Sequence, residues 1–419
     1  MRTASWLLGL LTIAACGDAR RAPPPAPAPE PPAAAASATP PARADAATTP
    51  ARDPLLGTCA VAAGAATMTA DALVGALLDE AGQRLDAGAY ADAFTCADMA
   101  ADRAPRSIEA HHLRGAALAG AGRDDEARVA YDLALALDPE DPETLRAVAD
   151  FYVNVIADKT RDTTALGLEL ARRGSARATA RRRGQADLRA ELALIEAQGW
   201  NDLGRADLAL ERAAAAVALD GTLTDALHEH GVALFNLGRF REAAARLEQV
   251  LAARPDEPYA HHMLGLALEQ LGRGAEAATH FARARALAPD EFPPPVEITM
   301  AEMEAEIRRA VAALPPETRA KAALVPITVA DVPDPTDLAA SDPPFPPTIL
   351  GLFRGLPLGA SPEPGEHPPA RAIVLYRMNL ARAVRSRAEL TEQIDRTIRH
   401  ELGHLDGLDE DDLRRRDLE

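Results

Sequence analysis

Two histidines near the C-terminal end of the chain, His400 and His404, form an H-E-x-x-H motif. Side chains four positions apart lie on one face of a helix, so both imidazoles can reach a single metal ion. Glu401, which follows the first histidine, can take a proton from a water molecule that the metal activates. The spacing therefore predicts a zinc-dependent hydrolase site with Glu401 as its general base.

The third ligand of such a site is expected among the carboxylates that follow the motif. Only fifteen residues follow His404, so we expect the ligand to come from the turn after the metal helix and not from a further long helix. Gly407 allows a tight or left-handed turn that ends the helix and returns the chain toward the metal. Asp406, Asp409 and Glu410 compete for this role. We expect Glu410, with Asp409 as the alternative.

An H-E-x-x-H motif also arises by chance on solvated helix faces, or persists at a site that no longer binds metal. The added glycine and carboxylate, at the offsets of a compact zinc site, favour a metal site over both alternatives.

The elements that must position this motif form a small α+β domain, which we expect at residues 291–419. The helical pattern of the preceding region ends at the prolines of 291–295, and residues 296–314 show the apolar spacing of an amphipathic helix. Ser386-x-x-Glu389 forms a capping box that opens the last long helix. Short apolar runs predict three strands at 325–329, 349–353 and 372–376.

The strand at 372–376 is expected to lie nearest the metal helix and to align an extended peptide by β-addition. Tyr376, Arg377 and His367 are candidates for stabilising the oxyanion, although a solvated loop position is favoured for His367.

Three segments of this region, at 350–355, 373–377 and 400–413, resemble the small bacterial "minimal" zincin-like metallopeptidase family. The resemblance covers about residues 292–419. It implies zinc ligation by His400 and His404, with Glu401 as general base in the hydrolysis of peptide bonds. In that family an aspartate stands as third ligand where this chain has Glu410.

Upstream, turn residues recur along the chain at regular distances. The intervals between them are 34, 82, 34 and 34 residues, counted over Pro105, Pro139, Gly221, Pro255 and Pro289. A glycine opens each turn between helices and an alanine follows it at a constant offset, as at Gly238 and Ala243. A period of 34 with helical patterning resembles the tetratricopeptide repeat (TPR) family over residues 72–289.

Within a repeat region at 55–290, clear repeats are expected at 72–105, 106–139, 188–221, 222–255 and 256–289. The interval of 82 residues equals two repeats plus 14, so 140–187 is expected to hold a degenerate repeat with an insertion. Stacked helical pairs bury their apolar faces and form a curved solenoid, whose groove commonly holds a protein partner. Several histidines fall in the first helices of the repeats, and surface or packing roles are expected for them: His111, His112, His228, His230, His261 and His262.

The N-terminal residues predict secretion and a lipid anchor. Residues 1–15 combine a positive start with a short apolar core, as in a signal peptide, and Cys16 ends a lipobox-like sequence, so its thiol is the expected lipidation site. Residues 16–54 are rich in Pro and Ala and are expected to form a disordered linker. The chain is therefore expected in a bacterial cell envelope, bound to the membrane through the lipid anchor only.

Composition limits the classes of partner. The formal net charge of −18 argues against nucleic acid. Two further cysteines, Cys59 and Cys96, could form a disulfide in an oxidising compartment or could be small buried hydrophobic residues.

Together these features predict a multidomain chain: an all-α TPR solenoid followed by a small α+β zincin-like domain. The expected function is that of a membrane-tethered metallopeptidase with a Zn²⁺ cofactor, which acts on a peptide or protein substrate and binds a protein partner through its repeats. The alternative is a non-catalytic TPR scaffold lipoprotein with a structural or decayed metal site.

Overall fold

The computed structural model describes residues 55, 57–61, 68–178, 185–362, 365, 367–416 and 418. The predicted signal peptide at 1–15, the lipidation of Cys16 and the linker at 16–54 lie outside the described residues. The chain divides into two compact units, with a boundary in the sequence between Leu137 and Asp138. No described helix is apolar over the length that crossing a bilayer requires.

The first unit contains two helical hairpins. A disulfide joins Cys59, in the segment before the first helix, to the fully buried Cys96 on the second, with an S–S distance of 2.02 Å. The helices are α1 (Ala70–Asp86), α2 (Tyr90–Arg103), α3 (Ile108–Gly120) and α4 (Asp124–Leu137).

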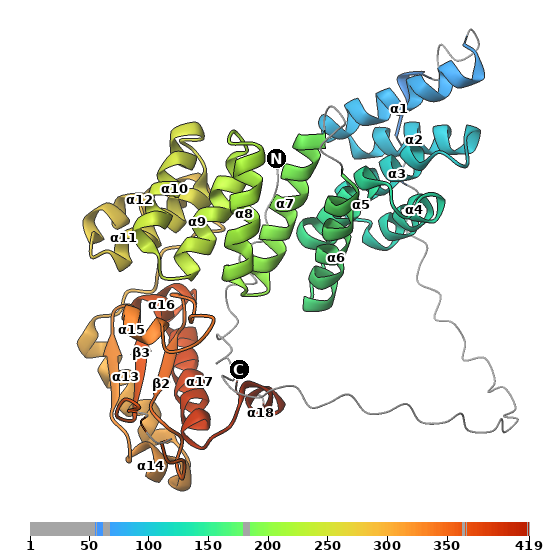
Figure 1. Cartoon of the computed structure of the whole chain (residues 1–419). Helices are drawn as coiled ribbons and strands as arrows, with labels where there is room; N and C mark the ends of the chain where they lie inside the picture. Colours follow the sequence, from blue (N-terminus) through green and yellow to red (C-terminus); the bar gives the residue numbers. More distant parts are fainter. Residues whose placement is uncertain are drawn as a thin grey trace, which may run out of the picture. The chain divides into compact units, whose positions relative to one another are not determined.

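The second unit begins with further hairpins of the same kind and continues into the C-terminal domain (Figure 1). Its repeat helices are α5 (Pro142–Asp150), which runs on as the π-helix η2 (Phe151–Val155), α6 (Arg161–Arg177), α7 (Gln185–Asp202), α8 (Ala206–Leu219), α9 (Thr224–Asn236), α10 (Phe240–Ala253), α11 (Pro258–Gln270) and α12 (Gly274–Leu287).

Small residues at fixed positions allow each hairpin to close. The turn glycines adopt a left-handed backbone, with φ of 70° at Gly238 and 72° at Gly272, a conformation that costs glycine little. Inside the last hairpin, a Cβ added to Gly265 would lie 2.7 Å from the ring of Phe281. The glycine therefore provides the space into which the partner helix places its bulky side chain.

The irregular stretch contains no separate inserted element among the described residues. Instead, the extra residues lengthen elements of the repeat: α6 has 17 residues and α7 has 18, whereas α9 has 13 and α10 has 14. Over the described residues, the extra length predicted at 140–187 is thus found in longer helices, whereas residues 179–184 lie outside the description.

The C-terminal domain has a three-stranded sheet in the order β1-β3-β2, in which β1 pairs with β3 in parallel and β2 in antiparallel fashion. Its strands are β1 (Ile327–Ala330), β2 (Gly351–Arg354) and β3 (Ala372–Tyr376). Its helices are α13 (Met300–Ala313), α14 (Pro316–Ala322), α15 (Pro335–Leu338), α16 (Arg377–Arg382), α17 (Arg387–Leu405) and α18 (Glu410–Arg415).

Several boundaries differ from the sequence-based expectation. Helix α13 begins at Met300, later than the expected residue 296, because Thr299 caps it in a reciprocal capping box with Glu302. The first two strands begin two residues later than expected, whereas β3 has the expected bounds.

The central position of β3 overturns one expectation. Because β3 is paired on both sides, its backbone cannot accept a substrate strand, so β-addition at 372–376 is excluded. The edges of this sheet are β1 and β2.

Alternate residues of the sheet face two different cores. Ile373 and Leu375 pack with apolar residues of α13 and α17, which share one core on one face of the sheet. Val374 and Tyr376 join the opposite core, which also contains residues of α9 and α11. The sheet therefore separates the helix that carries the motif from the core shared with the repeats.

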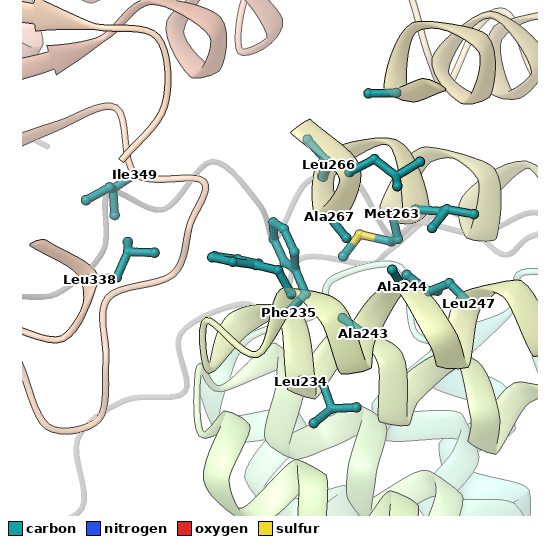
Figure 2. Packing of buried hydrophobic residues seen from close by; sticks show 14 of the residues in the cluster. Leu234, Phe235, Ala243, Ala244, Leu247, Met263, Leu266, Ala267, Leu338 and Ile349 are labelled. Atoms are coloured by element: carbon teal, nitrogen blue, oxygen red, sulfur yellow. The ribbon is translucent and has the colours of Figure 1, made fainter. Parts of the chain in front are cut away.

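The last repeats and the C-terminal domain share an apolar contact. Figure 2 shows the ring of Phe235, at the end of α9, directed toward Leu338 and Ile349 of the domain. Beside it, Arg382 donates two hydrogen bonds to Glu269, at 2.8 and 2.5 Å. The same guanidinium lies 4.6 Å from the ring centroid of Phe281. The end of the repeat array is thus a structural support for the domain.

Candidate metal centre

Helix α17 carries three of the residues of the motif. Ser386 caps its first turn by accepting a hydrogen bond from the backbone N–H of Glu389 at 3.2 Å. The Glu389 carboxylate accepts from the N–H of Arg385 and not from that of Ser386, so only one of the two bonds of the expected capping box forms. Ile394 and Ile398, both fully buried, anchor the helix in the core.

The turn after α17 returns the chain to the same helix. Gly407 has a φ of 82°, and the N–H of Leu408 donates to the carbonyl of Gly403 at 3.0 Å. A Cβ on Gly403 would lie 2.4 Å from Leu413 of α18, so this glycine lets α18 approach closely. As a result Glu410, the first residue of α18, faces the two histidines.

The three side chains converge on one point. Nε2 of His404 lies 3.1 Å from Nε2 of His400 and 3.2 Å from Oε1 of Glu410. Nε2 of His400 lies 3.7 Å from the same carboxylate oxygen. All these atoms lie within 4.8 Å of one another, and all three residues are buried.

Backbone carbonyls orient both imidazoles. Nδ1 of His400 donates to the carbonyl of Leu418 and Nδ1 of His404 to that of Leu408, each at 3.0 Å. With Nδ1 protonated, the lone pair of each Nε2 points toward the shared centre, which is how proteins usually orient metal-ligating histidines. Two imidazoles and a carboxylate form a donor set that suits zinc.

The competing carboxylates are engaged elsewhere. Asp409 is exposed and caps α18, where its side chain accepts from the N–H of Asp412 at 2.7 Å. Asp406 is also exposed and accepts from Lys321 at 2.8 Å. Of the three carboxylates considered from the sequence, Glu410 alone lies with the histidines.

Glu401 is buried beside this centre, under strand β2. Burial raises the pKa of its carboxyl, although the two histidines and a backbone hydrogen bond from Phe353 act in the opposite direction. A Cβ on Gly351 would lie 3.0 Å from Oε1 of Glu401 and 2.6 Å from a methyl group of Thr397. Gly351 is therefore needed for β2 to lie against Glu401, a role that no pattern in the sequence indicated.

The carboxylates also affect the first histidine. Burial by itself lowers the pKa of His400, but the nearby carboxylates of Glu410 and Glu401 outweigh it and raise the pKa. The site is therefore organised to hold positive charge.

The residues expected to stabilise the oxyanion have other surroundings in the structure. Tyr376 is fully buried and donates its hydroxyl hydrogen to Asp337 at 3.0 Å. Arg377 donates to Asp331 at 2.7 Å and to the carbonyl of Ile298 at 2.8 Å. His367 is exposed. The first two side chains make contacts within the domain, and the hydrogen bonds described for them do not include a residue of the metal centre, although the charge of Glu401 acts on the Tyr376 hydroxyl.

Comparisons with known proteins match both parts of the chain. Residues 322–419 match the family model described as zincin-like metallopeptidase. Residues 108–141 and 228–292 match two tetratricopeptide repeat models. A search among curated proteins finds no match.

Solved structures resemble the repeat part. PilW, a type IV pilus biogenesis factor, shares 15% identity at a TM-score of 0.46, covering 52% of this chain and 96% of its own. Pseudomonas aeruginosa pilF shares 15% identity at a TM-score of 0.45, covering 53% and 96%. YrrB, a TPR protein with an unusual peptide-binding site, shares 18% at a TM-score of 0.36, covering 46% and 93%.

The family matches agree with the helical hairpins and with the small domain around α17. They point to protein interaction for the first part and a metallopeptidase-like role for the second. The chain therefore joins tetratricopeptide repeats to a C-terminal zincin-like metallopeptidase domain.

Proposed function

We propose that this protein is a zinc-dependent metallopeptidase in which His400, His404 and Glu410 hold the ion and Glu401 acts as general base. The observation that carries the proposal is the convergence of two oriented imidazoles and one carboxylate on a single buried point, with the buried Glu401 next to it in the helix.

A zinc ion, when bound there, supplies a Lewis acid that polarises the scissile carbonyl and makes water a better nucleophile near neutral pH. Glu401 accepts the proton of the attacking water and delivers it to the leaving nitrogen. The raised pKa of its carboxyl suits this transfer, because a base is most effective when its pKa lies near the working pH.

The position of the edge strand β2 favours a peptide as the substrate. Among the described strands β2 pairs on one side only, and its residues Gly351 and Phe353 lie directly against Glu401. An extended peptide that pairs with β2 would therefore pass beside the general base.

A second candidate is a scaffold whose metal site is structural. The burial of the centre favours it: His400, Glu401, His404 and Glu410 are all at least nine-tenths buried, whereas catalytic zinc sites keep one position open.

The proposal also includes the lipid anchor and the binding of a partner by the repeats. Lipidation of Cys16 would tether the protein to a bacterial envelope membrane, and the repeats would bind a protein partner or the substrate itself. Since the last hairpins support the domain, we assign partner binding to the repeats before α9.

Metal content and peptide hydrolysis of the purified chain test the proposal. We expect about one zinc ion per chain at the centre, removed by His404→Ala. We also expect Glu401→Gln to retain zinc and to lower hydrolysis of unstructured proteins by about 10²- to 10⁴-fold. Zinc binding without any hydrolysis that depends on Glu401 would favour the scaffold. Failure to bind zinc at His404 would reject the metallopeptidase.

A further inference from the structure

A second histidine pair lies on the last helical hairpin. Nδ1 of His261 on α11 lies 2.9 Å from Nδ1 of His280 on α12, and both residues are half-buried. On its other side, Nε2 of His261 lies 2.9 Å from the carbonyl oxygen of Pro255. A neutral imidazole carries one proton. If that proton is donated to Pro255, Nδ1 of His261 is an acceptor, and the proton between the rings belongs to His280.

This pair shares its geometry with the pair in the metal centre. The facing nitrogens are 2.9 Å apart at His261 and His280 and 3.1 Å apart at His400 and His404. In both pairs a backbone carbonyl binds the opposite nitrogen of a ring and so selects the tautomer. Two nitrogen ligands of a tetrahedral zinc ion, each at about 2.0–2.1 Å, lie about 3.3 Å apart. A small movement of the rings would therefore admit an ion.

His111 shows which part of the arrangement belongs to the repeat. Its Nε2 lies 2.9 Å from the carbonyl oxygen of Pro105, six residues earlier, as His261 does with Pro255. The residue that corresponds to His280 in that repeat is Ala130, and Nδ1 of His111 has no hydrogen-bond partner among the described residues. The bond to the proline carbonyl is thus common to both repeats, whereas His280 adds a second imidazole at one place.

The surroundings of His280 keep its ring available as a ligand. Burial and the neighbouring His261 lower the pKa of His280, against the effect of Glu248 and Glu276. Glu276 is held by two hydrogen bonds from Arg273, at 2.8 and 2.7 Å. Among the described residues, a carboxylate joins two imidazoles within ligand distance only at His400, His404 and Glu410, so the ring pair is the part of this site that the fold has built.

We propose that His261 and His280 form a second metal site, for a divalent first-row transition ion such as Zn²⁺. The two Nδ1 atoms would hold the ion, with water as the remaining ligands. On binding, His280 moves its proton from Nδ1 to Nε2, so both lone pairs face the ion and no proton is lost. Imidazole is a preferred ligand of these ions. The ion would link the helices of the hairpin that supports the metallopeptidase domain.

Zinc titration of the full chain by calorimetry tests the site, with stoichiometry as the readout. We expect two ions per chain for the wild type, one for His280→Ala, one for His404→Ala and none for the double variant. His261→Gln should act like His280→Ala. His111→Ala, the matched control, should leave two ions bound.

An unchanged stoichiometry in both His280→Ala and His261→Gln would overturn this proposal, as would equal loss in His111→Ala. The result is independent of the proposed peptidase: one ion that is lost in His280→Ala and retained in His404→Ala would support the second site and reject the first. Thermal unfolding of each variant, without zinc, identifies any loss that is due to misfolding.

Discussion

The repeats and the metallopeptidase domain reach stable packing in different ways. In the repeats, a residue meets its main partner within the same hairpin, as Gly265 meets Phe281. The turn glycine and the alanine five residues after it recur in each of the clear repeats. In the domain, partners are far apart in sequence. Lys321 binds Asp406 across 85 residues, and Gly351 of β2 lies against Glu401 of α17.

This difference explains why sequence patterns predict the packing of the repeats better than that of the domain. A repeated local contact leaves a period that one sequence displays several times, whereas a contact between distant segments appears once and leaves no period. We therefore expect substitutions in the repeats to affect stability with little effect on the metal centre, and substitutions in the domain to affect both.

Among the changes considered, removal of the disulfide is expected to have the largest effect on stability. It closes a loop with a sequence separation of 37 residues, which corresponds to about 4 kcal/mol of reduced chain entropy in the unfolded state. Cys59→Ser with Cys96→Ala should lower the unfolding free energy of the first hairpins by about this amount, measured by urea denaturation. Zinc binding at His404 should not change, and a change there would contradict the separation between the two regions.

A substitution of Arg382 tests the contact between the repeats and the C-terminal domain. Its side chain and that of Glu269 are mostly buried, at 17% and 15% exposure, so Arg382→Met leaves a carboxylate without its partner and should cost about 2–3 kcal/mol. Arg283, whose ion pair with Asp256 is exposed, provides the control, and Arg283→Met should cost less than about 1 kcal/mol. Equal losses in chemical denaturation would mean that the contact does not support the domain.

The C-terminal tail tests how far the metal centre depends on contacts between distant residues. Because the backbone carbonyl of Leu418 orients His400, a chain that stops at Arg416 should bind zinc at this centre about 10- to 100-fold more weakly. Leu418→Ala keeps the carbonyl and should bind zinc like the wild type. Competition titration with a chelator distinguishes the two, and equal affinities for both variants would exclude this role for the carbonyl.

The smallest expected effect is that of pH on the unfolding free energy, through His262 at the contact between the repeats and the C-terminal domain. His262 stacks on Phe292 with ring centroids 4.6 Å apart, and burial, with Arg382 nearby, lowers its pKa to about 3. The folded state therefore holds this ring neutral. Its contribution to stability is present above the ordinary pKa of about 6.5 and is lost as pH falls toward 3.

Between pH 7 and pH 5 the unfolding free energy should fall by about 1–2 kcal/mol through His262. Denaturation at the two pH values measures this slope, and His262→Gln should make it shallower. His367→Gln, which changes an exposed loop histidine, should leave it unchanged. A slope that is the same in His262→Gln and the wild type would show that this ring is protonated in the folded state.

The sequence alone determined the features that depend on local spacing. The 34-residue period predicted the helical hairpins, because the glycines and alanines that close each hairpin recur within it. The spacing of His400 and His404 placed both on one helical face, and Gly407 predicted the turn that follows. Each of these statements concerns residues that interact within about one turn or one hairpin.

Only the tertiary structure decided between alternatives that satisfy the same local rules. Asp409 and Glu410 are adjacent in sequence, and the capping of α18 turned the first to solvent and the second to the histidines. Strand β3 could not be recognised as central until β1 and β2 were paired with it. The burial of Glu401 under Gly351, and the contact of Tyr376 with Asp337, depend on segments that meet only when the whole domain packs. Such contacts are set by the shapes of distant surfaces, which local sequence does not specify.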